Sequence, residues 1–355
     1  NLSNDERVIV NPKLTVQSIF HWFYLSINIG ALSPMITTNI EKYHSYWLAY
    51  LTPLIMFVIA IMILIFVNKK LIKEPPRGSA LLNFFFVLRV AFARDRNLEN
   101  AKPSNIPQEY SAKHRITWND EFVDQVKVGL QALKVFILFP FYWVCYTQIH
   151  NNLISQAATM RVGKIPNDIM NNLDPIVLII FTPLANHVLY PYLQRLGITL
   201  RPITRIFIGY MLITAAMVYS AIVQNMIYNT GPCYINTRCT INNVQVPNDI
   251  SVWWQSPSYI LIGLSEIFTS ITGLNYAYNK APESLKSTVT AIFLITSAFG
   301  ALLGLAIVPL SRDPYLVLMY ALLGGCSFIT GCLMLYFFKK YDDEEAESEK
   351  IIVIR

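Results

Sequence analysis

The sequence predicts an all-α membrane protein, and three observations support this prediction. Of its 355 residues, 54% are hydrophobic and only 14% are charged, whereas a soluble domain has about 25% charged residues. Apolar runs of about 20 residues, the length that crosses roughly 30 Å of hydrocarbon, recur along the whole chain. The basic residues gather in alternate loops, as they do on the cytoplasmic side of membrane proteins. Together these observations predict about eight transmembrane helices.

The first two predicted spans, residues 16–36 and 47–67, follow a polar lead-in at residues 1–15 that we place in the cytoplasm. Only a short polar loop at residues 41–44 separates the two spans, which predicts a pair of antiparallel neighbouring helices. The chain begins with Asn1 and not with Met. We therefore expect that an N-terminal piece is missing.

A long connection rich in Lys and Arg, residues 69–134, follows the second span. The positive-inside rule places this linker in the cytoplasm. Residues 80–93 have the pattern of an amphipathic helix that is too short to span, so we expect it at the membrane surface. Thr117 and Asp120 have the spacing of a capping box, which predicts a second linker helix that begins near them.

Six more spans are predicted in the second half of the chain, at residues 135–149, 175–193, 206–227, 259–278, 289–310 and 315–338. Trp253 and Trp254 precede the fourth of these spans and are expected to anchor it at the membrane interface. Basic loops at residues 69–134, 195–205, 280–286 and 339–340 alternate with loops poor in Lys and Arg. This alternation places both ends of the chain in the cytoplasm, the C-terminal end as an acidic tail at residues 341–355.

Two of the five cysteines, Cys233 and Cys239, lie together in a polar loop. If this loop faces an oxidising compartment, the two residues can form a small disulfide. Cys145, Cys326 and Cys332 lie in apolar spans, where cysteines pack as small hydrophobic residues.

The fourth span of the second half carries a carboxylate, Glu266, near its middle. A charge at the centre of a membrane helix costs roughly 2.5 to 3.5 kcal/mol, so such a residue usually faces a cavity or a partner. The alternative is a protonated packing residue or one half of a structural ion pair. The polar residues of the same span predict a hydrophilic side that faces a wet cavity; they are Ser265, Thr269, Ser270, Thr272 and Asn275. At about 4 Å and an effective dielectric near 20, a carboxylate attracts an ammonium by about 4 kcal/mol before desolvation, so a cationic amine is a plausible ligand.

Other spans hold polar and aromatic residues that are also candidates for lining a path. Asn28 lies one helical turn after Tyr24 in the first span, and Asp174 directly precedes the span at residues 175–193. Trp143 and Tyr146 lead toward Asn151 in the span before it. For these aromatic and amide residues, an interfacial belt is an equally good interpretation.

Several function classes lack support in the sequence. It contains no HExxH motif, no Cys and His cluster at metal spacing, no Walker loop and no GxGxxG. We therefore predict no metal, nucleotide or other cofactor, and if the protein is a transporter an ion gradient must supply the energy. The net charge of +6 is carried by a few loops, a pattern that indicates a membrane and not nucleic acid. No paired carboxylates or nucleophile with a base appear within the spans, so we predict no enzyme.

Four short motifs resemble those of one family. Residues 23–32, FYLSINIGAL, resemble the FYxxINxGxL signature of proton-coupled oligopeptide transporters, a branch of the major facilitator superfamily. Residues 265–274, SEIFTSITGL, resemble the second signature, GExxxSPxGL, and residues 281–287, APESLKS, resemble the turn before the eleventh helix. Residues 142–146 and 151–156 are similar to the seventh helix of fungal members.

The resemblance implies a major facilitator-type bundle of which this chain holds helices five to twelve. Residues 16–68 would then be the last two helices of the N-terminal bundle, and residues 135–340 the C-terminal six-helix bundle. The first four helices, with the ExxER motif associated with proton coupling, are expected to be missing. Such an N-terminally truncated chain is not expected to transport alone.

The same resemblance implies roles for site residues. Glu266 matches the carboxylate that holds the free amino terminus of a peptide, with Asn28 and Asp174 at that end of the pocket, and Phe293 matches a side-chain pocket wall. The full predicted substrate-binding set is Tyr24, Asn28, Trp143, Tyr146, Asn151, Asp174, Glu266, Ser270 and Phe293. Three positions depart from the family pattern: Ser265 replaces a glycine, Ile271 a proline and Asn186 a commonly acidic residue. The last departure argues against a proton relay through that helix.

The resulting hypothesis is proton-coupled symport of di- and tripeptides by alternating access in a membrane, with the plasma membrane as the expected location. Its partners would be peptides, protons and the lipid bilayer. Two alternatives remain open from the sequence. One is a related carrier of nitrate or another small solute, and the other is a peptide-sensing receptor that does not transport.

Overall fold

The computed structural model describes residues 23, 25–71, 80–107, 116–163, 167–236, 239–241 and 244–354. Within this part of the chain, seven helical segments are long and apolar enough to cross a membrane, so the chain is a multi-pass membrane protein. They are Tyr46–Lys70, Asp120–Ala158, Met170–Arg195, Pro202–Tyr228, Val252–Lys280, Glu283–Leu310 and Leu316–Asp342. These seven correspond to seven of the eight predicted spans. The remaining one, at residues 16–36, falls partly outside the described residues.

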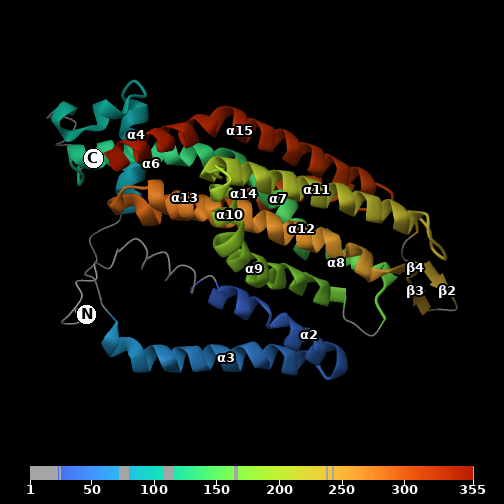
Figure 1. Cartoon of the computed structure of the whole chain (residues 1–355). Helices are drawn as coiled ribbons and strands as arrows, with labels where there is room; N and C mark the ends of the chain where they lie inside the picture. Colours follow the sequence, from blue (N-terminus) through green and yellow to red (C-terminus); the bar gives the residue numbers. More distant parts are fainter. Residues whose placement is uncertain are drawn as a thin grey trace.

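The N-terminal helices form an antiparallel pair below the main bundle (Figure 1). Residues 25–31 are helical, α2 spans Pro34–Tyr43 and α3 spans Tyr46–Val67, followed by a 3₁₀ turn, η1, at Asn68–Lys70. Pro34 suits the first position of α2 because that position needs no N–H donor. The predicted loop at residues 41–44 is shorter than expected, because α2 continues to Tyr43.

The linker forms two helices at one end of the bundle (Figure 1). The first, α4, spans Ala80–Ala93 as predicted and buries Phe84, Val87 and Val90, which share one helical face. The 3₁₀ turns η2, Leu98–Ala101, and η3, Pro103–Asn105, precede the second helix, α6, Asp120–Val135.

The predicted cap of α6 is wrong by two residues. Asn119 directly precedes the helix, and its side-chain oxygen accepts the backbone N–H of Phe122 at 2.9 Å. Thr117 instead donates its hydroxyl to the side chain of Asn83 at 2.7 Å, which joins α6 to α4. Asn is as good an N-cap as Thr, and its position next to the first helical residue decides the outcome.

Exposed ion pairs tie η2 to α6. The ammonium of Lys102 lies 2.8 Å from Glu99 and 2.8 Å from Asp124, and Lys127 lies 3.1 Å from Glu99. The two ammonium groups hold the pKa of the Glu99 carboxyl below its ordinary value of 4.5. The two carboxylates raise the pKa of Lys102 above its ordinary value.

The main bundle starts with two interrupted helices. The first continues from α6 through four segments, which are η4 (Phe136–Leu138), α7 (Phe139–Tyr146), η5 (Thr147–His150) and α8 (Asn152–Ala158). The second contains η6, Asn167–Asn172, α9, Leu173–Leu184, the π-helical η7, Ala185–Leu189, and α10, Tyr190–Arg195. Pro183 lies two residues before η7 and provides no N–H for the helical ladder, which favours this irregular turn.

The last four spans complete the bundle. Helix α11 spans Pro202–Tyr228 without interruption. The span around Glu266 consists of η8, Val252–Gln255, α12, Ser256–Glu266, the π-helical η9, Ile267–Ile271, and α13, Thr272–Lys280. It is followed by η10, Glu283–Leu285, α14, Lys286–Ile307, and η11, Val308–Leu310. The last helix, α15, spans Leu316–Ile354, so the helix continues into the predicted acidic tail.

Helix α15 is bound to the start of α11 through one aspartate. Asp342 is 3% exposed, and its carboxylate accepts the backbone N–H groups of Ile203 and Thr204, each at 3.0 Å. The Thr204 hydroxyl also donates to it at 3.0 Å. The first residue of the acidic stretch therefore caps another helix, where its negative charge complements the positive end of the α11 dipole.

Four short strands lie at the opposite end of the bundle from α4 (Figure 1). Strands β1, Met160–Arg161, and β4, Asn248–Ser251, pair in parallel, whereas β2, Cys239–Ile241, and β3, Val244–Val246, pair antiparallel. They add a small β element to the predicted all-α architecture.

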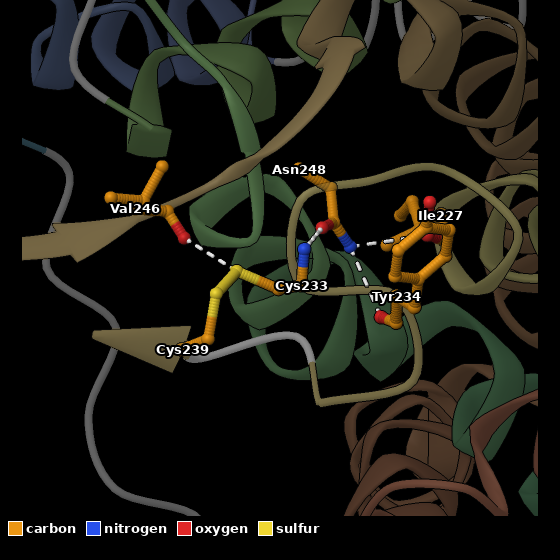
Figure 2. Close-up of a disulfide and its surroundings, with 6 residues drawn as sticks. All are labelled: Ile227, Cys233, Tyr234, Cys239, Val246 and Asn248. Atoms are coloured by element: carbon orange, nitrogen blue, oxygen red, sulfur yellow. Dashed lines mark hydrogen bonds between the residues drawn. A yellow bond between two sulfur atoms is a disulfide. The ribbon is translucent and has the colours of Figure 1, made fainter. Parts of the chain in front are cut away.

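A disulfide joins Cys233 to Cys239 beside these strands, with a Cα to Cα distance of 5.4 Å (Figure 2). The buried side chain of Asn248 holds the loop from inside. Its oxygen accepts the backbone N–H of Cys233 at 2.8 Å, and its amide donates to the carbonyl oxygens of Ile227 at 3.1 Å and Tyr234 at 3.2 Å (Figure 2). The disulfide and the asparagine thus fix the connection between α11 and the next span.

Candidate functional site

Glu266 stands at the point where α12 widens into the π-helical turn η9. Its side chain is half-buried, and its Oε2 atom accepts the hydroxyl of Tyr146 at 3.0 Å. Single π-helical turns are often found at functional sites, because the extra residue in the turn changes the direction of the side chains around it. Here Glu266 faces α7, whereas three residues later Thr269 faces α11.

The same tyrosine connects Glu266 to a second carboxylate. Tyr146 Oη lies 3.3 Å from Oδ2 of Asp174, which is 6% exposed in the first turn of α9. The other carboxylate oxygen, Oδ1, is buried and has no hydrogen-bond partner among the described residues. The expectation that the spans hold no paired carboxylates is therefore wrong, because residues far apart in sequence meet across α9 and α12.

A glycine makes this arrangement possible. Helices α9 and α12 pack closely, and a Cβ atom at Gly263 would lie only 2.9 Å from Asp174 Oδ1 and 3.0 Å from Val177 Cγ1. Contacts this short require the neighbouring atoms to move. The missing side chain at Gly263 therefore leaves the space that the aspartate occupies, in the way that small residues generally permit close helix packing in membranes.

The electrostatics of the carboxylate pair favour a cation. No Lys, Arg or His nitrogen of the described residues lies within ion-pair distance of Glu266 or Asp174. One hydroxyl proton, that of Tyr146, serves both carboxylates, so it cannot satisfy both fully. An ammonium group carries three donors and a positive charge, which match the remaining acceptor oxygens of the pair.

Aromatic rings border the pair on one side. Tyr142 stacks on Tyr146 with 6.2 Å between ring centroids, and Trp143 packs edge to face on Tyr146 at 5.5 Å. The indole N–H of Trp143 donates to the hydroxyl of Thr296 on α14 at 2.9 Å. Phe293 is 1% exposed and packs edge to face on Trp143, at 6.3 Å between ring centroids.

The polar residues that follow Glu266 mostly pack against protein. Ser265 and Thr269 are fully buried, with Ser265 at 3.2 Å from the Tyr142 hydroxyl and Thr269 at 3.4 Å from the carbonyl oxygen of Ile206. A Cβ at Gly209 would collide with Thr269 Oγ1 and lie 2.9 Å from the Ser265 carbonyl oxygen. Ser265 and Thr269 therefore do not line the predicted wet cavity, because their hydroxyls face α7 and α11.

The other predicted site residues occupy different surroundings. Ser270 is 7% exposed within η9, close in sequence to Glu266, and Asn28 is buried in the helical stretch at residues 25–31. Asn151 is exposed and lies at the start of α8. Tyr24 lies outside the described residues. Of the predicted site residues, the structure brings Tyr146, Asp174 and Glu266 into direct hydrogen-bond contact.

Sequence reasoning missed three contributors to the site, namely Gly209, Gly263 and Thr296. Their shared signal is a small or hydroxyl residue within an apolar span, which in a membrane helix marks an interhelical contact. The described residues contain no cluster of three His, Cys, Asp or Glu side chains that could bind a metal ion.

The candidate site thus consists of two carboxylates joined by one tyrosine hydroxyl between membrane-length helices. A family model described as PTR2, POT family, matches residues 4–322. The chain therefore belongs to the POT family, which is a family of transporters and not of enzymes.

Individual relatives agree with this assignment. The chain is 43% identical over 344 residues to the peptide transporter PTR_C of Candidozyma auris, with 97% of this chain and 59% of that protein covered. It is 43% identical over 349 residues to the probable peptide transporter ptr2 of Schizosaccharomyces pombe, with 98% and 56% covered. The chain thus spans less than two thirds of the length of these relatives.

The fold is also that of a solved structure. The crystal structure of the POT family transporter PepTSo superposes with a TM-score of 0.71 at 19% identity, and covers 93% of this chain and 72% of that one. At this identity the likeness shows the fold alone, which agrees with the predicted major facilitator-type bundle.

Proposed function

We propose that the protein carries out proton-coupled symport of di- and tripeptides by alternating access. The observation that supports this best is the hydroxyl of Tyr146 between Glu266 and Asp174 inside the bundle. The free amino terminus of a peptide is an ammonium, and the carboxylate pair supplies the charge and the acceptors that an ammonium needs. The relatives named above carry peptide transporter in their names, which agrees with this substrate class.

The roles of the residues follow from their chemistry. Glu266 and Asp174 hold the ammonium, Tyr146 orients both carboxylates, and Trp143 forms an aromatic border for the adjacent part of the peptide. A proton on one carboxylate would lower the repulsion within the pair when no ammonium is present. A proton and the peptide ammonium would then compete for the same carboxylate charge. This competition is a simple basis for coupling proton movement to peptide transport. The remaining predicted residues, Tyr24, Asn28, Asn151, Ser270 and Phe293, would complete or support the pocket.

We further propose an orientation of the bundle in the membrane and a cellular location for the protein. The basic linker and the basic residues that precede Asp342 lie at one end of the bundle, and the disulfide lies at the other. The positive-inside rule and the chemistry of disulfides both favour a cytoplasmic linker end and an external disulfide end. We place the protein in the plasma membrane with both ends of this chain in the cytoplasm.

Uptake of a labelled dipeptide across an imposed pH gradient by a full-length form of the protein tests the function. The protein with Glu266→Gln should lose most of the uptake, because the amide has no charge to offer an ammonium. Glu283→Gln is the matched control, since Glu283 is an exposed carboxylate in the turn η10. Unchanged uptake by Glu266→Gln would contradict the proposal.

The same assay separates the alternatives. A nitrate or small-solute carrier would show no competition by peptides, and an acidic pair is a poor site for an anion. A receptor would bind the labelled peptide without accumulating it. Either result would overturn peptide symport.

A further inference from the structure

A surface cavity lies away from the carboxylate pair, between the end of α10 and the start of α11. Its volume is about 250 Å³. The residues that line it include Tyr190, Leu193, Gln194, Thr199, Arg201 and Arg205. Two guanidinium groups, an amide and a hydroxyl in one cavity form a donor-rich surface, which is suited to an anion.

The side chain of Arg205 is held in place by its own neighbours. Its guanidinium carbon lies 3.9 Å from the centroid of the Tyr190 ring, and its Nε donates to the carbonyl oxygen of Leu200 at 2.7 Å. Its two terminal nitrogens donate to no described residue, and no described carboxylate lies within ion-pair distance of it. The stacked ring thus orients a guanidinium whose outer edge remains available for a bidentate contact.

Arg201 is the second cation of the cavity, and Asp342 provides a carboxylate near it. Arg201 donates to the backbone oxygen of Asp342 at 2.9 Å. The Asp342 carboxylate itself accepts two backbone N–H groups and the hydroxyl of Thr204, at the positive end of the α11 dipole. These contacts offset its negative charge, so the cavity keeps a basic character.

The cavity lies at the basic end of the bundle and next to apolar surface. Asp342 connects it to the end of the last span, directly after Lys339 and Lys340. The residues that line the cavity include the apolar Leu193 and Ile198, and Ile198 is 50% exposed. A basic cavity at a membrane surface with exposed apolar side chains next to it offers places for both parts of a phospholipid.

We propose that this cavity binds the phosphate-containing headgroup of an anionic phospholipid. Arg205 and Arg201 contact the phosphate oxygens, Gln194 and Thr199 contact the polar headgroup, and the acyl chains extend from the cavity along the apolar side chains of Leu193 and Ile198. The site is separate from the peptide site. It therefore does not depend on the proposed transport function.

Native mass spectrometry of the purified protein tests this site. The protein is incubated with phosphatidylserine and phosphatidylcholine of equal chain length, so that only the headgroup differs. The wild type should retain phosphatidylserine about tenfold better, since contacts with a charged partner are the strong ones. Arg205→Gln should abolish the preference, and Arg205→Lys should keep part of it, because lysine retains the charge but not the planar fork.

Arg195→Gln provides the matched control. Arg195 is exposed at the end of α10 and carries the same charge, but it does not line the cavity. It should leave the preference within about twofold of wild type, because an exposed charge contributes little. An equal loss in Arg195→Gln and Arg205→Gln would overturn the cavity as the site, and so would equal retention of the two lipids by the wild type.

A competition experiment on the wild-type protein distinguishes the lipid from a soluble anion. Its result does not depend on whether a variant folds. Inorganic phosphate and the soluble headgroup glycerophosphoserine are added to the complex with phosphatidylserine. Both should displace the lipid poorly, since they lack acyl chains for the apolar surface. Displacement by inorganic phosphate at a concentration equal to that of the lipid would overturn the lipid assignment.

Discussion

Two spans of this chain show opposite relations between polarity and burial. Helix α3 is apolar along its whole length, and none of its most apolar stretch is buried in the structure. The span around Glu266 contains a carboxylate and several hydroxyls, and 61% of its most apolar stretch is buried. Within the described residues, the more polar span packs inside the bundle, whereas the less polar span makes few contacts with the rest of this chain, which spans less than two thirds of the length of its relatives.

The difference shows what holds a membrane bundle together. Lipid tails are as apolar as a leucine side chain, so apolar surface alone does not drive helices together. Close contacts through glycine, serine and threonine do so, as at Gly209 and Thr269, and polar groups turn toward each other, as Tyr146 and Glu266 do. The following predictions test this contrast, from the largest expected effect to the smallest.

Gly209→Ala should cause the largest loss of stability, about 3 kcal/mol, because its Cβ would collide with Thr269 and crowd the backbone of Ser265. The thermal unfolding midpoint of the purified protein in detergent measures this loss. Gly325→Ala in α15 is the matched control, since a Cβ there meets no atom within 4 Å. Equal midpoints for the two variants would contradict the close contact between α11 and η9.

A pair of isoleucines compares the two spans directly. Ile262 in α12 is fully buried, and Ile262→Ala should cost about 2 kcal/mol through the cavity it leaves. Ile63 in α3 is 56% exposed, so Ile63→Ala should leave the unfolding midpoint almost unchanged. If the α3 variant were the less stable of the two, the assignment of inside and outside would be wrong.

Tyr146→Phe removes the only hydroxyl among the described residues that bonds both carboxylates. It should weaken peptide binding about tenfold, because the carboxylates lose the donor that orients them. Tyr142→Phe is the control, since its hydroxyl bonds Ser265 and neither carboxylate. Peptide competition against labelled dipeptide uptake gives both affinities, and similar values would exclude a positioning role for Tyr146.

The exposed charges of the linker should have the smallest effect on stability. The folded pKa of Glu99 is lowered, so its contribution to stability is present above its ordinary value of 4.5 and is lost as the pH falls through the lower folded value. Limited proteolysis of the linker should therefore be unchanged between pH 7 and 5 and should accelerate only in stronger acid. Lys102→Met should reduce this acid dependence, and an unchanged acid dependence in Lys102→Met would show that the ion pair does not stabilise the linker.

Much of the fold could be predicted from the sequence, because in a membrane protein the length and hydropathy of each span carry the signal. The bounds of α4 agree with prediction, and those of α3 differ by one residue. The cap of α6 was assigned to Thr117 instead of Asn119, since both residue types cap helices and only the local backbone distinguishes them. The π-helical turns and short strands depend on tertiary packing, which no periodicity reveals.

The site could be predicted only in part. Glu266 was found because a charge in an apolar span is unusual, but its pairing with Asp174 required the packing of α9 on α12. That packing depends on Gly263, whose role is a missing side chain. The stripe of Ser265 and Thr269 had the pattern of a wet face, because hydroxyls that line water and hydroxyls that join helices look the same in sequence.

The central claim is that Glu266 and Asp174 hold the ammonium of a peptide, and one competition experiment tests it most directly. Uptake of a labelled dipeptide is measured against the same dipeptide with a free or an acetylated amino terminus. The wild type should prefer the free amine by at least about tenfold, the expected value of a charge-assisted contact. Glu266→Gln and Asp174→Asn should each reduce this preference and leave the affinity for the acetylated peptide nearly unchanged. A preference for the free amine that persists undiminished in both variants would contradict the claim.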